Sequence, residues 1–258
     1  MREVDLQTGV LLTPGVSMTV RFRVVAIAVV LSTALVAARA EGPEPARTAQ
    51  DALGLLKAGN DRFVRNASSP VSLSINRRQE LAAGQHPFAM VLSCVDSRVP
   101  PEYVFNTGLG DLLVIRTAGE VIDKSILASV EYGAEHLHIP LLVVMGHESC
   151  GAVTAAAQAK DEPTSASMTY LIKAIQSARR PKQEREDIKG LILANVEQVI
   201  NDAMTGSALL QRKVDIGELG VIGAYYELVS GRVMFSEMVH AESSSPRSAG
   251  AAPRPERH

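Results

Sequence analysis

The sequence predicts an α/β fold in which helices flank a mostly parallel central β-sheet. Short runs rich in Val, Leu and Ile alternate with longer segments of helical periodicity, a pattern typical of parallel strands connected by helices. Two of these runs, at residues 88–93 and 141–145, are followed within two residues by Cys or His. Because ligands bind at the carboxyl ends of the strands in open α/β sheets, these two runs also predict where the site lies.

The predicted strands are apolar runs bounded by turn residues. They span residues 88–93, 112–116, 141–145 and 219–222, with an edge strand at 232–235 near the C-terminus that residues 225–231 link to the strand before it. The predicted helices carry apolar residues at helical spacing. They span residues 48–65, 77–83, 122–138, 168–178 and 184–204, and an Ala-rich helix begins after Cys150. The first helix precedes the sheet, so we expect an N-terminal helical arm that lies across the domain or a partner subunit.

The composition is that of an ordinary globular chain. Of the 258 residues, 46% are hydrophobic and 21% are charged, and the net charge is -2. The length is sufficient for one α/β domain with a sizeable core. No run of basic residues stands out, so the sequence gives no reason to expect a nucleic-acid partner.

The first forty residues predict a signal peptide. Arg21 and Arg23 precede an apolar run, and residues 38–40 read Ala-Arg-Ala, which fits a cleavage site. Met18 is a possible true start, and an uncleaved N-terminal anchor is the alternative. We therefore expect a periplasmic or secreted protein whose domain spans residues 41–240, without a stable membrane span after cleavage. The tail, 241–258, is rich in Ser, Pro, Arg and Ala and is predicted to be disordered.

The chain has two cysteines, Cys94 and Cys150, one near each of the two strand ends. In an oxidising compartment they could form a disulfide. The polar residues beside them, Asp96, Arg98 and His147, have no role in a structural disulfide and favour a metal site. His147 and Cys150 are three apart, which would place both on one face of a helix start. Cys94, Asp96 and Arg98 are two apart, which would aim all three to one side of an extended segment.

Two thiolates and an imidazole bind zinc well, and three protein ligands leave a fourth position for a reactive group. Such a zinc site is formally neutral, so its bound water should be less acidic than the pKa of about 7 found with three His ligands. Asp96 is placed to accept a hydrogen bond from that water, and Arg98 would hold Asp96 ionised. The Asp96 carboxylate could also swing onto the zinc as a further ligand and close the site.

The motif Cys94-x-Asp96-x-Arg98, followed by His147-x-x-Cys150, resembles the β-class carbonic anhydrases. The likeness continues through residues 110–119, 129–132 and 220–226, and covers roughly residues 53–235. By position, the resemblance implies that Cys94, His147 and Cys150 bind zinc. It implies that Asp96 and Arg98 form a catalytic dyad in which Asp96 either orients the zinc-bound hydroxide or ligates zinc. It also implies homodimers or larger assemblies, in which the N-terminal helix embraces the partner.

The resemblance further implies a substrate pocket. Gln85 matches a pocket glutamine and Tyr132 a pocket tyrosine. Leu113 stands where many plant-type members have Phe, and Ala118 where they have a larger residue, so the pocket wall here is expected to be roomier. The backbone N–H at Gly151, at a helix start, is expected to help hold an oxygen of the product.

The function these residues predict is zinc-dependent, reversible hydration of carbon dioxide to bicarbonate and a proton, by attack of zinc-bound hydroxide. Two alternatives stay open. One is a hydrolase of carbon disulfide or carbonyl sulfide on the same scaffold. The other is a non-catalytic exported protein that holds a disulfide or a structural zinc.

Overall fold

A computed structural model describes residues 48–68, 73–159, 165–181 and 183–239. The predicted signal peptide and the predicted disordered tail lie outside these ranges. None of the helices within them is long and apolar enough to cross a membrane.

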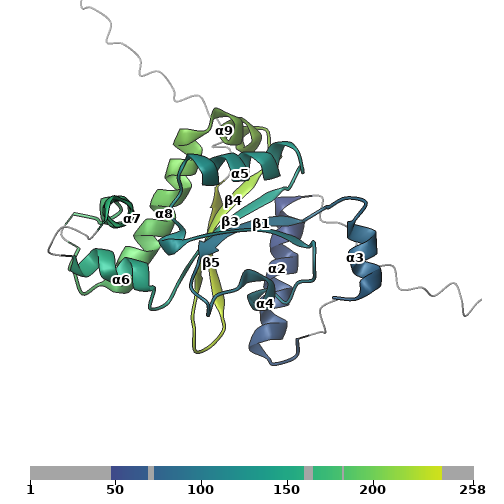
Figure 1. The fold of residues 1–258 in the computed structure, drawn as a ribbon, viewed down its shortest axis with the longest axis horizontal. Coiled ribbons are helices and arrows are strands. Elements are labelled where there is room, and N and C mark those ends of the chain that lie inside the picture. The colour runs from purple at the N-terminus through teal and green to yellow at the C-terminus, as the bar shows by residue number, and fades with distance from the viewer. Residues whose placement is uncertain (1–47, 69–72, 160–164, 182, 240–258) are drawn as a thin grey trace, which may run out of the picture. The chain divides into compact units, whose positions relative to one another are not determined.

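In the described part of the chain, five strands form one sheet in the order β2-β1-β3-β4-β5 (Figure 1). Their bounds are β1 Ala89–Cys94, β2 Leu112–Thr117, β3 Leu141–His147, β4 Gly220–Tyr226 and β5 Val233–Val239. The first four are parallel, and β5 pairs antiparallel with β4 at the edge. The predicted fold class is confirmed. Because β1 and β3 are central neighbours, their carboxyl ends lie side by side, with Ser93 paired to Met145.

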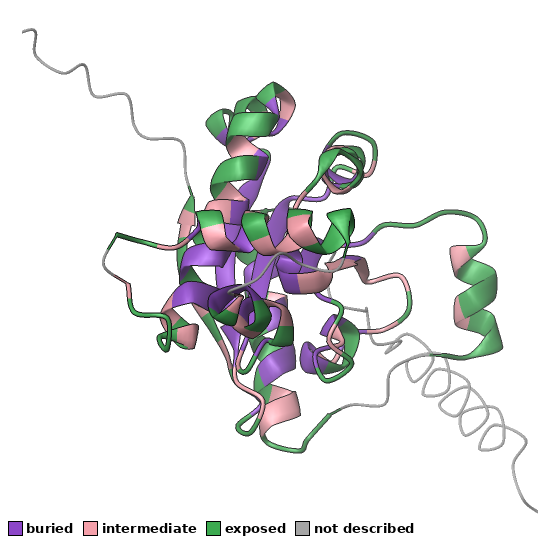
Figure 2. Cartoon of the chain, turned by 60° about the vertical axis from the view of Figure 1, so that its left-hand side comes forward, coloured by how far each residue is buried: buried purple, intermediate pink, exposed green. Residues whose placement is uncertain are grey.

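Helices cover both faces of the sheet (Figure 1). One face carries α2 (Ala49–Val64) and α4 (Pro101–Val104), and the other carries α5 (Lys124–Glu135), α8 (Ile188–Gly206) and α9 (Ala208–Asp215). The turn η1 (Ala118–Glu120) follows β2, and α6 (Gly151–Gln158) follows β3 and packs against α7 (Ala166–Ser177). The short α3 (Ile75–Leu81) has no buried residue. Figure 2 shows that the inner strands β1, β3 and β4 are buried, whereas the outward faces of the helices are exposed.

The first helix, α2, lies across its own domain. Thr48 accepts a hydrogen bond from the Asp51 backbone and Asp51 bonds back to the Thr48 backbone, which forms a capping box that fixes the helix start. Its inner side chains, Ala52 and Leu56, are fully buried in the core of the same chain. A Cβ at Gly59 would lie 1.8 Å from the Phe105 carbonyl oxygen, so glycine is required where α2 meets the end of α4. The expectation that this helix lies across the domain is therefore met within one chain.

Several predicted boundaries were wrong. Tyr225 and Tyr226 belong to β4 rather than to a link, because aromatic side chains suit a buried strand that pairs with β3 along its whole length. The edge strand extends to Val239. The sequence reading also missed α9, a short helix that Ser207 caps by accepting a hydrogen bond from the Leu210 backbone.

Candidate metal centre

Cys94, His147 and Cys150 meet at the carboxyl edge of the sheet. Cys94 ends β1, His147 ends β3, and Cys150 immediately precedes α6. All three are buried, and their ligand atoms lie within 4.8 Å of one another. The two sulfurs are 3.9 Å apart, and both cysteines are free. A disulfide needs about 2.05 Å, whereas two Zn–S bonds of about 2.3 Å at a tetrahedral angle place sulfurs about 3.8 Å apart. The spacing therefore fits two thiolates on one zinc.

The ring of His147 is oriented for metal binding. Its Nδ1 lies 2.9 Å from the Glu148 carbonyl oxygen, which can only accept, so Nδ1 carries the proton and Nε2 has the free lone pair. Nε2 is buried and has no hydrogen-bond partner among the described residues. A buried nitrogen without a partner is costly unless it binds something, and a backbone carbonyl on the other ring nitrogen is the usual support of a ligating His. The residues therefore fit a zinc ion held by Cys94, His147 and Cys150.

The backbone brings these residues together by turns, and two expectations about spacing were wrong. His147 and Cys150 do not share a helix face: the chain reverses between them at Ser149, whose φ is +53°. Residues 95–98 are not extended either. The Arg98 N–H donates to Asp96 Oδ1, which forms a tight Asx turn after β1. Both corrections have one cause, since parallel strands end in sharp turns where their helices or loops begin.

Arg98 holds the carboxylate of Asp96 at both oxygens. Its Nε donates to Oδ1 at 2.9 Å and its Nη2 to Oδ2 at 2.7 Å. These hydrogen bonds hold the pKa of Asp96 well below its usual range, so the carboxylate is ionised at all working pH values. Oδ2 also lies 3.9 Å from His147 Nε2, so the charge faces the cluster from its side.

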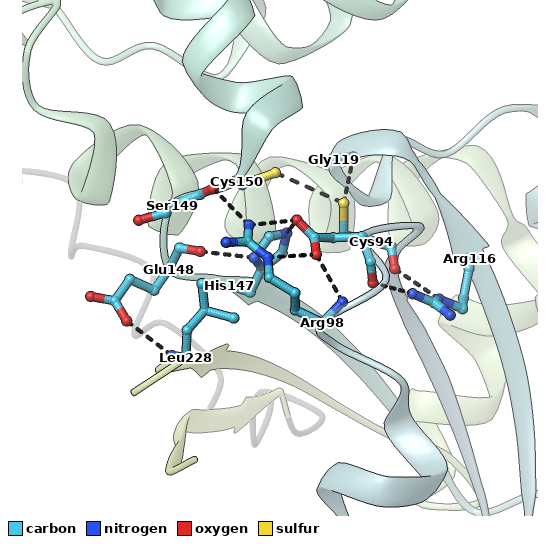
Figure 3. Close-up of polar contacts among 10 residues, drawn as sticks. Cys94, Arg98, Arg116, Gly119, His147, Glu148, Ser149, Cys150 and Leu228 are labelled. Carbon is cyan, nitrogen blue, oxygen red and sulfur yellow. Dashed lines mark hydrogen bonds and ion pairs between the residues drawn. The ribbon is translucent and has the colours of Figure 1, made fainter. Parts of the chain in front are cut away.

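Two arginines brace the loops that carry the ligands, residues 94–98 and 147–150 (Figure 3). Arg98 reaches the Ser149 carbonyl at 3.4 Å, and Arg116 on β2 donates to the carbonyls of Cys94 and Asp96. The sequence reading missed Arg116, although a charged residue near the end of an apolar strand was a usable signal. Each loop is thus fixed by a guanidinium that bonds backbone oxygens, and the ligands are held in place before metal arrives.

The hydrogen bond between the two sulfurs shifts the pKa values of the two thiols in opposite directions. The hydrogen bond between the sulfurs lowers the pKa of Cys94. The same bond, together with burial, raises the pKa of Cys150. A metal ion that binds both sulfurs as thiolates must displace the proton of their hydrogen bond, so metal binding releases acid.

Comparison with known proteins identifies the family. The model of the carbonic anhydrase family matches residues 89–233, which is more than half of the chain. The chain belongs to the carbonic anhydrase family. Carbonic anhydrase 2 of Mycobacterium tuberculosis is 37% identical over 190 residues, which cover 71% of this chain and 91% of the relative.

Solved β-carbonic anhydrases share the fold of this carbonic anhydrase. The Coccomyxa β-carbonic anhydrase, solved with acetazolamide, has a TM-score of 0.58 and 24% identity, with 72% of this chain and 86% of that chain covered. One of two tetrameric β-carbonic anhydrases from Sordaria macrospora has a TM-score of 0.56 and 22% identity, with 63% of this chain and 87% of that chain covered. At these identities the likeness shows the fold.

The predicted pocket residues fall into two groups in this carbonic anhydrase. Ala118 begins the turn after β2, at the carboxyl edge, and Gly151 is exposed, with open space where a Cβ would be. Leu113, however, pairs with Met90, four residues before Cys94 and about 13 Å along the strand.

Tyr132 and Gln85 also lie toward the amino-terminal end of the sheet. Tyr132 adjoins Gly133, which packs against Leu113. Tyr132 is 48% exposed, and its ring lies tilted against that of His136. Gln85 is exposed in the segment before β1. The cluster of Cys94, His147 and Cys150 in the same chain lies at the opposite, carboxyl ends of the strands.

Glu120 is a carboxyl group that the sequence reading did not single out. It is fully buried, and its Oε2 has no hydrogen-bond partner in the described part of the chain. Burial raises its pKa from 4.5 to about 8, so the folded carbonic anhydrase holds Glu120 as a neutral acid at pH 7.

Glu120→Gln should stabilise the protein increasingly as pH rises. The unfolded chain loses this proton near pH 4.5, whereas the folded chain keeps it up to about pH 8. Between those values the unfolded state binds fewer protons, so wild-type stability falls with pH and then levels off. Urea unfolding at about pH 5 and about pH 8 should show the advantage of the variant growing. Glu218→Gln, at an exposed glutamate, is the control, and an advantage that stays constant would contradict a buried neutral acid.

Proposed function

We propose that this carbonic anhydrase catalyses zinc-dependent, reversible hydration of carbon dioxide to bicarbonate and a proton. The observation that carries the proposal is the buried cluster of two thiols and one partnerless imidazole nitrogen, with an Arg-held carboxylate 3.9 Å from that nitrogen. The relatives' names support the reaction, and the donor set supports zinc. When bound, zinc supplies a water of lowered pKa as the nucleophile.

The side chains around the cluster have separable tasks. Asp96, ionised and facing the cluster, accepts a hydrogen bond and so orients the nucleophile toward carbon dioxide. Arg98 occupies both Asp96 oxygens, which favours Asp96 as an acceptor over Asp96 as a further ligand. The N-terminus of α6 at Gly151 attracts the negative charge that develops on the product.

The pocket residues at the amino-terminal ends of the strands support a homodimer or a dimer of dimers. Gln85 and Tyr132 are exposed and lie away from their own cluster. We propose that they line the site of a second copy, together with the roomier wall that Leu113 leaves. Light scattering should then give a mass of at least two chains, and a monomer with full activity would contradict this arrangement.

The test of the function is stopped-flow hydration of carbon dioxide with zinc content measured on the same purified sample. Fast turnover at one zinc per chain is the expected result. Zinc without turnover would contradict the proposed reaction. Carbon disulfide and carbonyl sulfide should be assayed in parallel, since the missing pocket bulk at Leu113 and Ala118 is what favours a hydrolase as the second candidate. Faster turnover of either would reassign the substrate.

Carbon dioxide hydration should rise between neutral and alkaline pH. Asp96 cannot cause this rise, because its pKa is held well below the usual range. A zinc ion held by two thiolates and an imidazole would be formally neutral, so its bound water would ionise above the pKa of about 7 of three-His zinc sites. Initial rates from about pH 6 to about pH 9 should follow one ionisation. The Glu120→Gln variant should keep the rise, which separates it from the ionisation of Glu120. A flat profile would contradict the assignment.

We also propose that the protein is exported to the periplasm or secreted, with residues 1–40 removed. The basic residues, apolar run and Ala-Arg-Ala site support this proposal. N-terminal sequencing of protein from fractionated cells should find Glu41 first. Recovery of the intact N-terminus in a membrane fraction would favour the uncleaved anchor instead.

A further inference from the structure

Behind Cys94 the chain makes an unusual turn. Gly119 and Glu120 are both left-handed, with φ of +61° and +46°. In this conformation the Gly119 N–H points at the Cys94 sulfur and donates to it at 3.4 Å. A Cβ at Gly119 would lie 2.9 Å from Ile175, so glycine fits the position, but Glu120 adopts a conformation that side-chain-bearing residues avoid. Something must hold the turn.

Asn195 on α8 holds it. The side-chain nitrogen of Asn195 donates to the Gly119 carbonyl at 2.7 Å and to Glu120 Oε1 at 3.2 Å. An amide nitrogen has two hydrogens, so both are used. Asn195 is 1% exposed and lies 76 residues from Gly119 in the sequence. Because this buried amide donates both of its hydrogen bonds to one strained turn, it defines the geometry of that turn.

The Glu120 carboxyl suits this arrangement as a neutral group. A charged carboxylate in a fully buried place, with one amide donor and its second oxygen without a partner, would be strongly disfavoured. It would also repel a thiolate at Cys94. A neutral carboxyl accepts from Asn195 without adding negative charge beside the metal ligands.

We propose that Asn195 is a positioning residue for the metal ligand Cys94, acting through the Gly119–Glu120 turn that directs an N–H at the Cys94 sulfur. The proposal rests on the zinc part of the proposed function. The N–H···S bond withdraws electron density from the thiolate, so the metal keeps more positive character than two free thiolates would allow. Groups that support a ligand in this way tune affinity and reactivity of the metal.

The test uses cobalt(II) in place of zinc. In the Asn195→Leu variant, which keeps the branched shape and removes both donors, the sulfur-to-cobalt charge-transfer band should move to longer wavelength, because an unbonded thiolate gives up an electron more easily. Zinc affinity, measured by chelator competition, should weaken by about 10- to 100-fold. Glu120→Gln should keep the wild-type band, because an amide oxygen accepts from Asn195 as a neutral carboxyl does.

The matched control is Val199→Ala, which removes packing from the same helix without touching the turn. An equal shift in Val199→Ala, or an unshifted band and affinity in Asn195→Leu, would overturn the proposal. Should Asn195→Leu not fold, the native chain loaded with cadmium-113 still decides. The Gly119 amide proton should show scalar coupling to the metal across the hydrogen bond, and its absence would overturn the proposal. Failure of the wild type to bind any of these metals would instead refute the zinc site.

Discussion

Cys150→Ala should lose its zinc and, with it, turnover of carbon dioxide. Cys150 is fully buried and supplies one of the two sulfurs, 3.9 Å from the other. Its removal leaves one thiolate and one imidazole, and two protein ligands do not make the three-ligand site of a catalytic zinc. The loss of affinity should exceed the roughly 10- to 100-fold that removal of a supporting residue costs. Zinc per chain after gel filtration and the hydration rate are the two measurements.

A control separates ligand loss from a loosened fold. Val153 lies one turn further along α6 and is equally buried, so Val153→Ala should destabilise the chain but keep one zinc per chain. Full zinc in Cys150→Ala would overturn the ligand set. Thiol counting under denaturing conditions adds a check on the disulfide alternative, because the zinc reading requires two free thiols once the metal is removed.

Much of the fold follows from local sequence, because its core strands are nearly continuous apolar runs. Runs such as 141–145 are buried on both faces, and burial on both faces is what a parallel sheet requires. The ends of the strands were harder to predict. Residues Tyr225 and Tyr226 join β4 because β3 is there to pair with them. That partner is distant in the sequence, so no local pattern could mark the boundary.

The site divides in the same way. The ligands were predictable because the chain has two cysteines, and each follows a strand with polar neighbours. The residues that support the ligands were not predictable. Asn195 is one of several polar residues in an amphipathic helix, and only the folded chain shows that it reaches Gly119 from 76 residues away. For the pocket residues the resemblance supplied the positions but not their place in the fold. Gln85 and Tyr132 match a pocket by position, although their own chain places them at the amino-terminal ends of the strands, away from its cluster.

Asp96→Asn should lower turnover by about 100-fold while the protein keeps its zinc, because general acid–base and orienting groups contribute on this scale. The amide has the shape of the carboxylate but no charge, and it offers the donors of Arg98 one acceptor oxygen instead of two. The nucleophile then loses the group that orients it. Asp61→Asn is the control, since it breaks an exposed ion pair with Arg65 of 3.0 Å far from the cluster and should change neither quantity.

The outcomes distinguish the two roles of Asp96. Retained zinc with reduced turnover assigns the carboxylate to orientation of the nucleophile. Loss of zinc together with turnover would instead make Asp96 a resting ligand, in spite of the two bonds from Arg98. Unchanged turnover would reduce the Asp96–Arg98 pair to a brace of the loop after β1, a task that Arg116 already performs through the carbonyls of Cys94 and Asp96. Since Arg116 bonds those carbonyls without using the Asp96 side chain, the charge of Asp96 is free to serve the reaction.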